Sequence, residues 1–366
     1  MDKGNNKKMK TAVVSIAKLE NKYLPEFVEH YRHIGFSCVI IYDNNDIKGE
    51  KVSDVLKGYV DDGFVIIENV RGLCEIQKQC YTDAYTKYGK EYDWIAFFDC
   101  DEFLEIEGGG KIEEVLSRSL YSDYNGILVK WKVYGDNDLV DTGEDYSVKR
   151  FKEPCNESNV LNYRTKIILR GGIDGLKFST TSGGEHGHHI GQKCCDVLGN
   201  FVETESALTE LYHPYKIMWL NHYYMKTIKE FVKFKLMRQY PNISSHQCRF
   251  LLNISHFFAH NEYTEEKIKK ALSLLPKNPL VYCDRDDLRQ FFTFEHSSAE
   301  YELHVDNRLE MSPIDVFSLV YNVYILTTRC NISRWYPFRK TDGTIDFKGD
   351  GGIFNKVYLY KKDNLV

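Results

Sequence analysis

The chain has 366 residues, 43% of them hydrophobic and 28% charged, which is typical of a soluble globular protein with one large domain or two. A net charge of -5 argues against a general nucleic-acid binder. No stretch approaches the ~20 apolar residues that a membrane span needs, and the ten cysteines include no Cys-x-x-Cys pair of the zinc-binding kind. We therefore expect a cytoplasmic protein with reduced thiols.

The first hundred residues alternate between short apolar runs and stretches with the apolar spacing of a helix. This alternation predicts βαβ units and a mainly parallel sheet flanked by helices. The predicted strands are 11–17, 38–42, 64–68 and 94–98, and the predicted helices are 24–33, 52–59 and 76–88. Further along, the pattern predicts strands at 126–133, 148–151, 166–169 and 217–223 and helices at 112–120, 226–239, 264–275 and 313–326.

Carboxylates follow two of the predicted strands where these end. Asp43 comes after the second strand, and Asp99, Asp101 and Glu102 come directly after the fourth. Open α/β sheets bind ligands in a crevice at the carboxyl ends of their strands. Clustered carboxylates suit Mg²⁺ or Mn²⁺, which usually take one or two of them plus substrate phosphates. The alternative is a solvated acidic turn, because Asp-x-Asp is common by chance.

Segments 24–36, 41–45 and 92–104 resemble glycosyltransferases related to families 2 and 92, which have the GT-A fold and are common in bacterial polysaccharide gene clusters. Shorter pieces near residues 131–135, 164–166 and 221–226 fit the same family in the same order, which argues against chance.

This resemblance covers roughly residues 11–240. It implies an α/β fold in which a GT-A (Rossmann-like) domain over 1–260 precedes a mostly helical C-terminal extension over 261–366.

The resemblance also implies a nucleotide-sugar donor, most often UDP-linked, bound along the strand ends. Asp43 matches a residue that helps to hold the nucleotide base, and Gln77 matches a helix glutamine that precedes the Asp-x-Asp strand. Lys18 and Glu20 match the family's Lys-Asn-Glu motif, although Leu19 stands where the family has asparagine. That difference removes one polar contact to the donor.

Asp99 and Asp101 are the implied ligands of Mn²⁺ or Mg²⁺, which would stabilise the departing diphosphate, so Asp101 also counts as catalytic. A third ligand in GT-A enzymes is often a late histidine. We expect His222 in that role, with Lys226 nearby to contact phosphate. The alternative for His222 is a core histidine in an apolar strand.

A glycine-rich loop at 183–189 carries the remaining candidates. If the anomeric centre inverts, a carboxylate must accept the proton of the acceptor hydroxyl. Glu185 is our candidate for this base, with Asp136, Asp138 and Asp174 as competitors, and His186 and His188 are the alternative metal ligands.

Two aromatic residues, Trp131 and Tyr134, are candidates for stacking on an acceptor sugar, with core packing as the alternative. The predicted basic helix at 226–239 is either a solvated face, a guide for the anionic donor, or a peripheral contact with an anionic membrane that carries the acceptor.

Our hypothesis is a metal-dependent, inverting glycosyltransferase that uses a UDP-sugar and a saccharide or lipid-linked acceptor in capsule or O-antigen synthesis. One alternative is another Asp-x-Asp enzyme such as a nucleotidyltransferase, which would need a glycine-rich phosphate loop, and residues 15–20 contain no glycine. Another is a non-catalytic carbohydrate-binding protein, which would gain nothing from carboxylates at two strand ends.

Overall fold

The computed structural model describes residues 8–73, 76–139, 143, 145–157, 159–178, 190–204, 211, 213–227, 230–231 and 261, and strands at 292–297, 300–305, 335–339 and 345–349. The chain divides into two compact units, residues 1–135 with 145–224 and residues 136–144 with 225–366. Residue 260, where the sequence suggests a domain boundary, lies outside the described residues.

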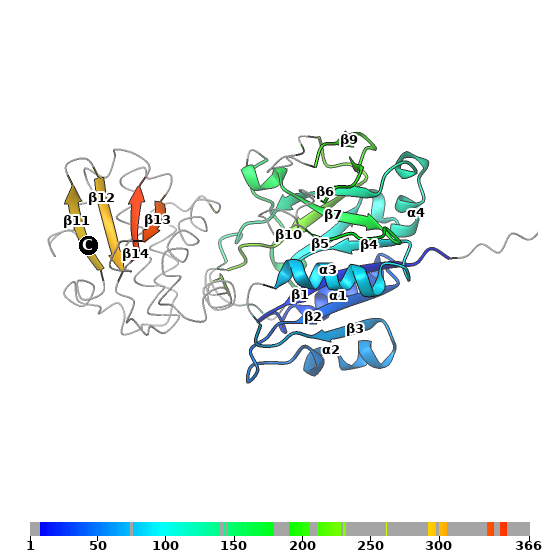
Figure 1. Cartoon of the computed structure of the whole chain (residues 1–366), viewed down its shortest axis with the longest axis horizontal. Helices are drawn as coiled ribbons and strands as arrows, with labels where there is room; N and C mark the ends of the chain where they lie inside the picture. The colour runs from blue at the N-terminus through cyan, green and yellow to red at the C-terminus, as the bar shows by residue number, and fades with distance from the viewer. Residues whose placement is uncertain are drawn as a thin grey trace, which may run out of the picture. The chain divides into compact units, whose positions relative to one another are not determined.

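The first unit is built on a twisted sheet, which in the described part of the chain has ten strands (Figure 1). Its main path runs β3-β2-β1-β4-β7-β6-β10-β5, with β8 beside β6 and β9 beside β8. The strands are β1 (Thr11–Ala17), β2 (Cys38–Asp43), β3 (Val65–Asn69), β4 (Trp94–Phe97), β5 (Glu102–Ile106), β6 (Gly126–Val133), β7 (Thr165–Arg170), β8 (Cys194–Asp196), β9 (Phe201–Val202) and β10 (Met218–His222).

The N-terminal half of this sheet is parallel and the other half is mixed. Strands β3, β2, β1 and β4 run parallel, whereas β7 is antiparallel to both β4 and β6. Strand β10 is parallel to β6 and antiparallel to β5, which ends the path. The predicted parallel sheet is therefore confirmed for its first four strands, and antiparallel strands extend it.

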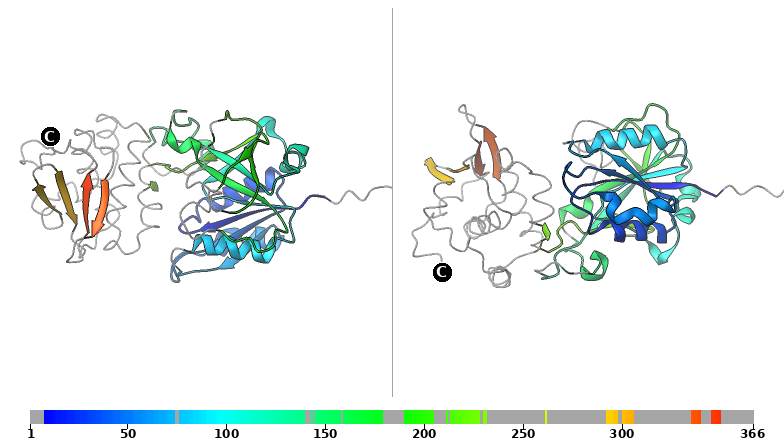
Figure 2. Two further views of the ribbon diagram at one scale, coloured as in Figure 1. Left: turned by 45° about the horizontal axis from the view of Figure 1, so that its top comes forward. Right: turned by 90° about the horizontal axis from the view of Figure 1, so that it is seen from below.

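Helices cover both faces of the parallel half (Figure 2). Residues of α1 and α2 belong to one buried apolar cluster and residues of α3 to another. Strand β1 serves both clusters, because successive side chains of a strand point to opposite faces. Val13 joins the cluster of α1, while Ala12 and Val14 join the cluster of α3. The helical segments are α1 (Leu24–His33), α2 (Val52–Asp61), α3 (Gln77–Tyr88), α4 (Ile112–Leu116), α5 (Ser147–Arg150), η1 (Glu107–Gly109), η2 (Ser119–Tyr121) and η3 (Val160–Tyr163).

The predicted strand at 148–151 is wrong, because α5 occupies this position. Its first backbone N–H groups, those of Ser147 and Val148, each donate a 2.8 Å hydrogen bond to the carboxylate of Glu26 on α1. A helix must satisfy these N–H groups, and here a residue more than a hundred positions away does so. The helix predicted at 112–120 is also shorter than expected, since α4 ends at Leu116.

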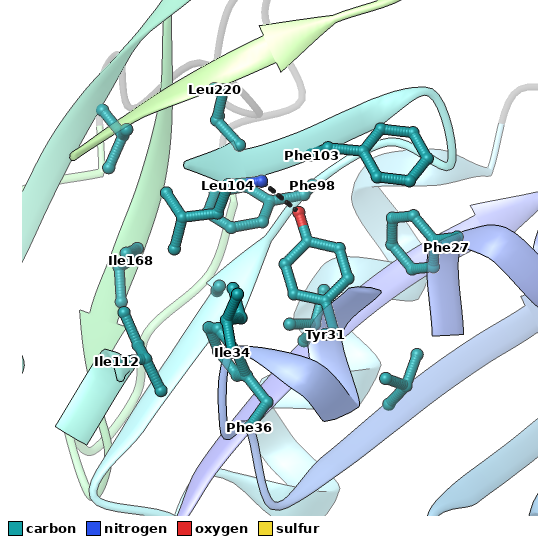
Figure 3. Close-up of a cluster of buried hydrophobic side chains, with 14 of the residues drawn as sticks. Phe27, Tyr31, Ile34, Phe36, Phe98, Phe103, Leu104, Ile112, Ile168 and Leu220 are labelled. Atoms are coloured by element: carbon teal, nitrogen blue, oxygen red, sulfur yellow. Dashed lines mark hydrogen bonds between the residues drawn. The ribbon is translucent and has the colours of Figure 1, made fainter. Parts of the chain in front are cut away.

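The sequence did not reveal β5, which follows immediately on the acidic turn. Tyr31 of α1 holds this strand in place (Figure 3). Its hydroxyl donates to the backbone oxygen of Glu102 at 2.8 Å and accepts from the backbone N–H of Leu104 at 3.2 Å. Around it, Phe27 and Phe103 pack in the same apolar cluster. The fold therefore fixes the end of the acidic turn through a buried tyrosine.

The described part of the second unit contains a four-stranded antiparallel sheet in the order β11-β12-β14-β13. Its strands are β11 (Phe292–Ser297), β12 (Glu300–Val305), β13 (Trp335–Arg339) and β14 (Ile345–Gly349). Pro337 lies in β13, an edge strand, where its missing N–H costs no bond inside the sheet. The helices predicted at 264–275 and 313–326, and most of that at 226–239, fall outside the described residues.

Candidate functional site

The predicted site residues of the N-terminal half gather at one edge of the sheet. Strand β1 pairs in parallel with β2 and β4, so the carboxyl ends of the three strands lie side by side. Lys18 and Glu20 follow β1, Asp43 closes β2, and the turn that contains Asp99 and Asp101 follows β4. The expectation that these side chains share an edge is met in the structure.

The turn between β4 and β5 is held by its own hydrogen bonds. The backbone N–H of Asp99 donates to Glu102 Oε2 at 2.8 Å, and the backbone N–H of Glu102 donates to the backbone oxygen of Asp99 at 3.0 Å. Glu102 is fully buried, and burial raises the pKa of its carboxyl well above the usual range. Glu102 therefore shapes the turn, whereas Asp99 presents about a third of its side chain, 34%, to solvent.

Asp99 is held from two sides. Gln77 Nε2 at 2.8 Å and the Tyr81 hydroxyl at 3.2 Å donate to Oδ1, both from α3. Lys166 Nζ donates to Oδ2 at 2.7 Å from β7. Burial raises the pKa of Asp99, but the Lys166 ammonium outweighs it and holds this pKa below the usual value. Asp99 is thus an oriented, ionised carboxylate, and the predicted partner Gln77 lies beside it.

Asp101 faces His222, which ends β10 more than a hundred residues later in the chain. Strand β10 pairs with β5 so that His222 lies opposite Glu102. This register brings His222 Nε2 to 3.3 Å from Asp101 Oδ1, with the two side chains 4% and 3% exposed. The backbone N–H of Tyr223 also donates to the backbone oxygen of Asp101 at 2.9 Å. The imidazole and the second carboxylate of Asp-x-Asp therefore adjoin.

Trp131 and Tyr134 lie beside the end of β10 that carries His222, and both are buried, with exposures of 7% and 9%. The Trp131 ring lies 4.2 Å from the His222 ring between centroids, and Tyr134 packs at 4.7 Å against Tyr223. The backbone N–H of Tyr134 donates to the backbone oxygen of His222 at 3.0 Å. The Trp131 ring thus packs directly against the imidazole, whereas the Tyr134 ring packs against the residue that follows it.

Lys166 is the residue of this cluster to which sequence reasoning gave no role. Its side chain is 1% exposed and lies 2.7 Å from Asp99 Oδ2 and 3.8 Å from Glu102 Oε1. The signal in the sequence was a lysine at the second position of a strand with an apolar centre. The side chain of such a lysine could equally have pointed to solvent. Only the antiparallel pairing of β7 with β4 turns it toward the acidic turn.

Asp43 organises the loop after β2 instead of offering open oxygens. Its Oδ1 accepts from the backbone N–H and the side-chain amide of Asn45 at 3.1 and 2.9 Å, and its Oδ2 accepts from the backbone N–H of Val52 at 3.1 Å. Asn45 in turn accepts from the backbone N–H of Leu19 at 2.8 Å. Asn45, which sequence reasoning missed, therefore ties the loop after β2 to the loop after β1.

Some of the remaining predicted site residues lie outside the described part of the chain. Lys226 is buried and belongs to the second unit. Asp174, a competing base, is 84% exposed and pairs with Lys90 at 2.9 Å. It follows the end of β7 that adjoins the start of β4, and is thus at the opposite edge of the sheet from Asp99. Glu185, His186 and His188 lie outside the described residues.

The described residues supply two side-chain ligands for a divalent cation, which leaves the other coordination positions to a substrate. Among the described residues, no three His, Cys, Asp or Glu side chains converge closely enough to hold a metal ion by themselves. Asp101 and His222 do converge, and they supply the oxygen and imidazole ligands that Mn²⁺ accepts. Mg²⁺ and Mn²⁺ commonly take one or two carboxylates and complete their coordination with substrate phosphates. This donor set therefore suits a metal that arrives with a phosphate ligand.

Comparison with known proteins identifies relatives in one family. The model of glycosyltransferase family 92 matches residues 10–195, about half of the chain. Proteins of that family from Ricinus communis and Oryza sativa subsp. japonica are 22% and 23% identical over 113 and 104 residues. These alignments cover 31% and 28% of this chain and 20% and 18% of the relatives, so the chain spans about a fifth of the length of the curated relatives it matches.

Among solved structures, S. aureus TarS 1–349 is similar over 82% of this chain and 98% of its own, with 13% identity and a TM-score of 0.32. The same protein in complex with UDP and with UDP-GlcNAc gives TM-scores of 0.33 at 12% and 13% identity. In the part of the present chain that the structure describes, no helix has the length and apolar character to cross a membrane.

Proposed function

The chain belongs to glycosyltransferase family 92, and we propose that it is a glycosyltransferase that transfers a sugar from a UDP-linked donor to a saccharide acceptor with the help of one divalent cation. The observation that carries the proposal is the contact between Asp101 and His222 in the turn that also holds Asp99, at the carboxyl edge of the parallel strands. An inverting reaction and an acceptor from surface-polysaccharide synthesis, lipid-linked or free, complete the proposal.

Transfer of a sugar requires stabilisation of the departing diphosphate. When bound, Mn²⁺ or Mg²⁺ supplies the positive charge that this leaving group needs. Asp101 and His222 would hold the cation, since their oxygen and nitrogen atoms already lie 3.3 Å apart. Asp99, with about a third of its side chain exposed at 34%, is the carboxylate of the cluster that reaches solvent, and would face the diphosphate side.

The loops after β1 and β2 would hold the nucleotide. Lys18 forms a 3.1 Å ion pair with Asp46, which places an ammonium group beside the loop after β2. Asp43 fixes that loop through Asn45 and Val52, so it supports base binding by shaping the backbone. Glu20 is buried next to the same loops. These residues would order a uridine pocket before the donor arrives, which lowers the entropic cost of binding.

On the acceptor side, Trp131 would act through His222, because its buried ring packs against the imidazole. Tyr134 is also buried and would act through Tyr223, against which its ring packs. Glu185 is the proposed general base, and Lys226 the proposed additional phosphate contact. Asp174 is disfavoured as a base, because it lies at the opposite edge of the sheet.

Titration calorimetry with UDP and GDP, each with and without Mn²⁺, tests the proposal. We expect UDP to bind at least tenfold more tightly with Mn²⁺ present, and GDP to bind more weakly than UDP. Asp101→Asn should abolish the effect of Mn²⁺, because asparagine keeps the size of the side chain but lacks the negative charge that holds a divalent cation.

The matched control is Asp61→Asn, at the exposed end of α2, which should bind Mn²⁺ and UDP like the wild type. Nucleotide binding that is indifferent to both Mn²⁺ and Asp101 would contradict the proposed metal-assisted mechanism.

A further inference from the structure

Lys166 introduces a permanent positive charge into the carboxylate cluster. Its side chain is 1% exposed, and its ammonium lies 2.7 Å from Asp99 Oδ2 and 3.8 Å from Glu102 Oε1. An ammonium removed from water is tolerated only where carboxylates compensate it. The cluster therefore holds this cation in place whether or not a ligand is bound.

The position of this ammonium matters because the carboxylates it contacts belong to the same turn as Asp101, a proposed ligand of the cation. Asp99 Oδ2 accepts from Lys166, and Asp99 Oδ1 accepts from Gln77 and Tyr81. Both oxygens of the first carboxylate are thus already engaged by donors. Glu102 Oε1 is buried and accepts no hydrogen bond from a described residue, and it too points toward the lysine.

A divalent cation at Asp101 and His222 would lie next to this lysine, since Asp101 is two residues from Asp99. Like charges in a site of such low exposure repel strongly, because little water screens them. The repulsion weakens binding of the metal ion alone. A diphosphate carries enough negative charge to reverse this balance, and its oxygens supply the coordination that the protein leaves incomplete.

We propose that Lys166 makes cation binding conditional on the nucleotide, so that metal and donor bind as a pair and neither binds tightly alone. The inference rests on the proposed function and specifies how its metal site is regulated. Linkage requires the coupling to be mutual: if UDP strengthens metal binding by a given factor, the metal strengthens UDP binding by the same factor. Lys166 thereby acts as a positioning and charge-setting residue.

The test is the affinity for Mn²⁺, read from the electron paramagnetic resonance signal of the free ion at constant neutral pH. In the wild-type chain, Mn²⁺ alone should bind weakly. Saturating UDP should lower the Kd of the protein for Mn²⁺ at least tenfold, after subtraction of the Mn²⁺ that free UDP binds in a sample without protein. In Lys166→Met, Mn²⁺ alone should bind at least tenfold more tightly, and the enhancement by UDP should shrink by a similar factor.

Two controls separate charge from packing. Lys166→Arg keeps the positive charge and should keep most of the coupling between Mn²⁺ and UDP. Lys90→Met removes an exposed lysine of the same unit, 78% exposed, and should leave both affinities unchanged.

The outcomes are distinguishable. Tight binding of Mn²⁺ to the wild-type chain without nucleotide would overturn the inference even if Lys166→Met failed to fold, while leaving the proposed function intact. A folded Lys166→Met protein with wild-type Mn²⁺ affinity and coupling would also overturn it. If the wild-type chain bound no UDP in the presence of Mn²⁺, the proposed function itself would fail, and the inference with it.

Discussion

The aspartates at the carboxyl ends of β2 and β4, Asp43 and Asp99, have different physical roles. The Asp43 carboxylate accepts hydrogen bonds from Asn45 and from the backbone of Val52, and its side chain is buried. The Asp99 carboxylate, in contrast, is bound by the side chains of Gln77 and Lys166 and reaches solvent. The first residue therefore maintains a loop, and the second belongs to the charged cluster beside the proposed metal site.

This difference predicts that the same substitution, aspartate to asparagine, has different effects at the two positions. Asp43→Asn should lower the free energy of unfolding by about 1–3 kcal/mol, because the new amide donates where Val52 N–H also donates. Asp99→Asn should lower stability as well, because it removes a carboxylate that compensates the buried Lys166 ammonium, and it should in addition weaken the binding of Mn²⁺ and UDP. Urea unfolding and calorimetry measure the two. Equal loss of stability without loss of binding in Asp99→Asn would contradict the assignment.

Leu19 has a positive φ of 57°, a conformation that leucine adopts at a cost and asparagine tolerates. A leucine thus stands here in a backbone conformation that suits asparagine better. We expect Leu19→Asn to be more stable than Leu19→Ala by roughly 0.5–1 kcal/mol, since both remove the same apolar contacts and only asparagine suits this backbone. Thermal unfolding of the two variants checks this, and an alanine variant of equal or higher stability would refute it.

At this scale, the sequence allowed prediction of where Asp99, Asp101 and His222 lie, because each follows or ends a strand with a recognisable pattern. It did not allow prediction of Lys166, whose role arises only when β7 pairs with β4. Asn45 was missed for a related reason. Its amide links two loops that are separated by more than twenty residues, and no local pattern records such a contact.

Among the elements, α5 shows most clearly how tertiary contacts override local preference. Residues 148–151 have strand-like composition, yet the two N–H bonds to Glu26 start a helix. Similarly, β5 begins at Glu102 inside an acidic turn, because Tyr31 and β10 bind its backbone. Both misjudged elements depend on partners that are distant in sequence, whereas the first four strands and three helices follow from their own apolar spacing.

Replacement of Glu26 by glutamine tests the helix start. The new side chain would accept from one of the two N–H groups and present its own amide to the other, so we expect a loss of about 1–3 kcal/mol. Glu29→Gln, on the exposed face of the same helix, should cost less than half as much. Urea unfolding measures both, and equal effects would show that Glu26 has no special role in starting α5.

His30 links α1 to β5 and makes stability depend on pH. Its Nε2–H donates to the backbone oxygen of Leu104 at 2.8 Å, and burial lowers its pKa from 6.5 to about 4. The unfolded chain therefore binds a proton between these values that the folded chain does not. The contribution of neutral His30 is complete above about pH 6.5 and is lost as the pH falls toward 4.

We expect the free energy of unfolding to fall by about 2 kcal/mol through His30 between mildly alkaline conditions and about pH 5. His30→Gln, which keeps an amide donor for Leu104, should remove that part of the pH dependence. Urea titrations of both proteins at the two pH values provide the measurement. Parallel pH profiles for the wild type and the variant would contradict this assignment.

At the level of the whole molecule, the sequence predicted the parallel half of the sheet because each βαβ unit buries its own apolar residues. The antiparallel half was not foreseen as such, since the direction of β7, β6 and β10 depends on long connections that carry no pattern of their own. The proposed cation site depends on both halves: the turn after β4 supplies the carboxylates, and β7 and β10 supply Lys166 and His222.

The central claim is that this edge of the sheet carries metal-assisted sugar transfer. It is tested most directly by the release of UDP from a panel of UDP-sugars, measured with saccharide acceptors and Mn²⁺. We expect at least one donor to be consumed, chelation of the metal to stop the release, and Asp101→Asn to lower the rate by roughly 10²–10³-fold while Asp61→Asn does not. Undiminished release by Asp101→Asn, or release unaffected by chelation, would contradict the claim.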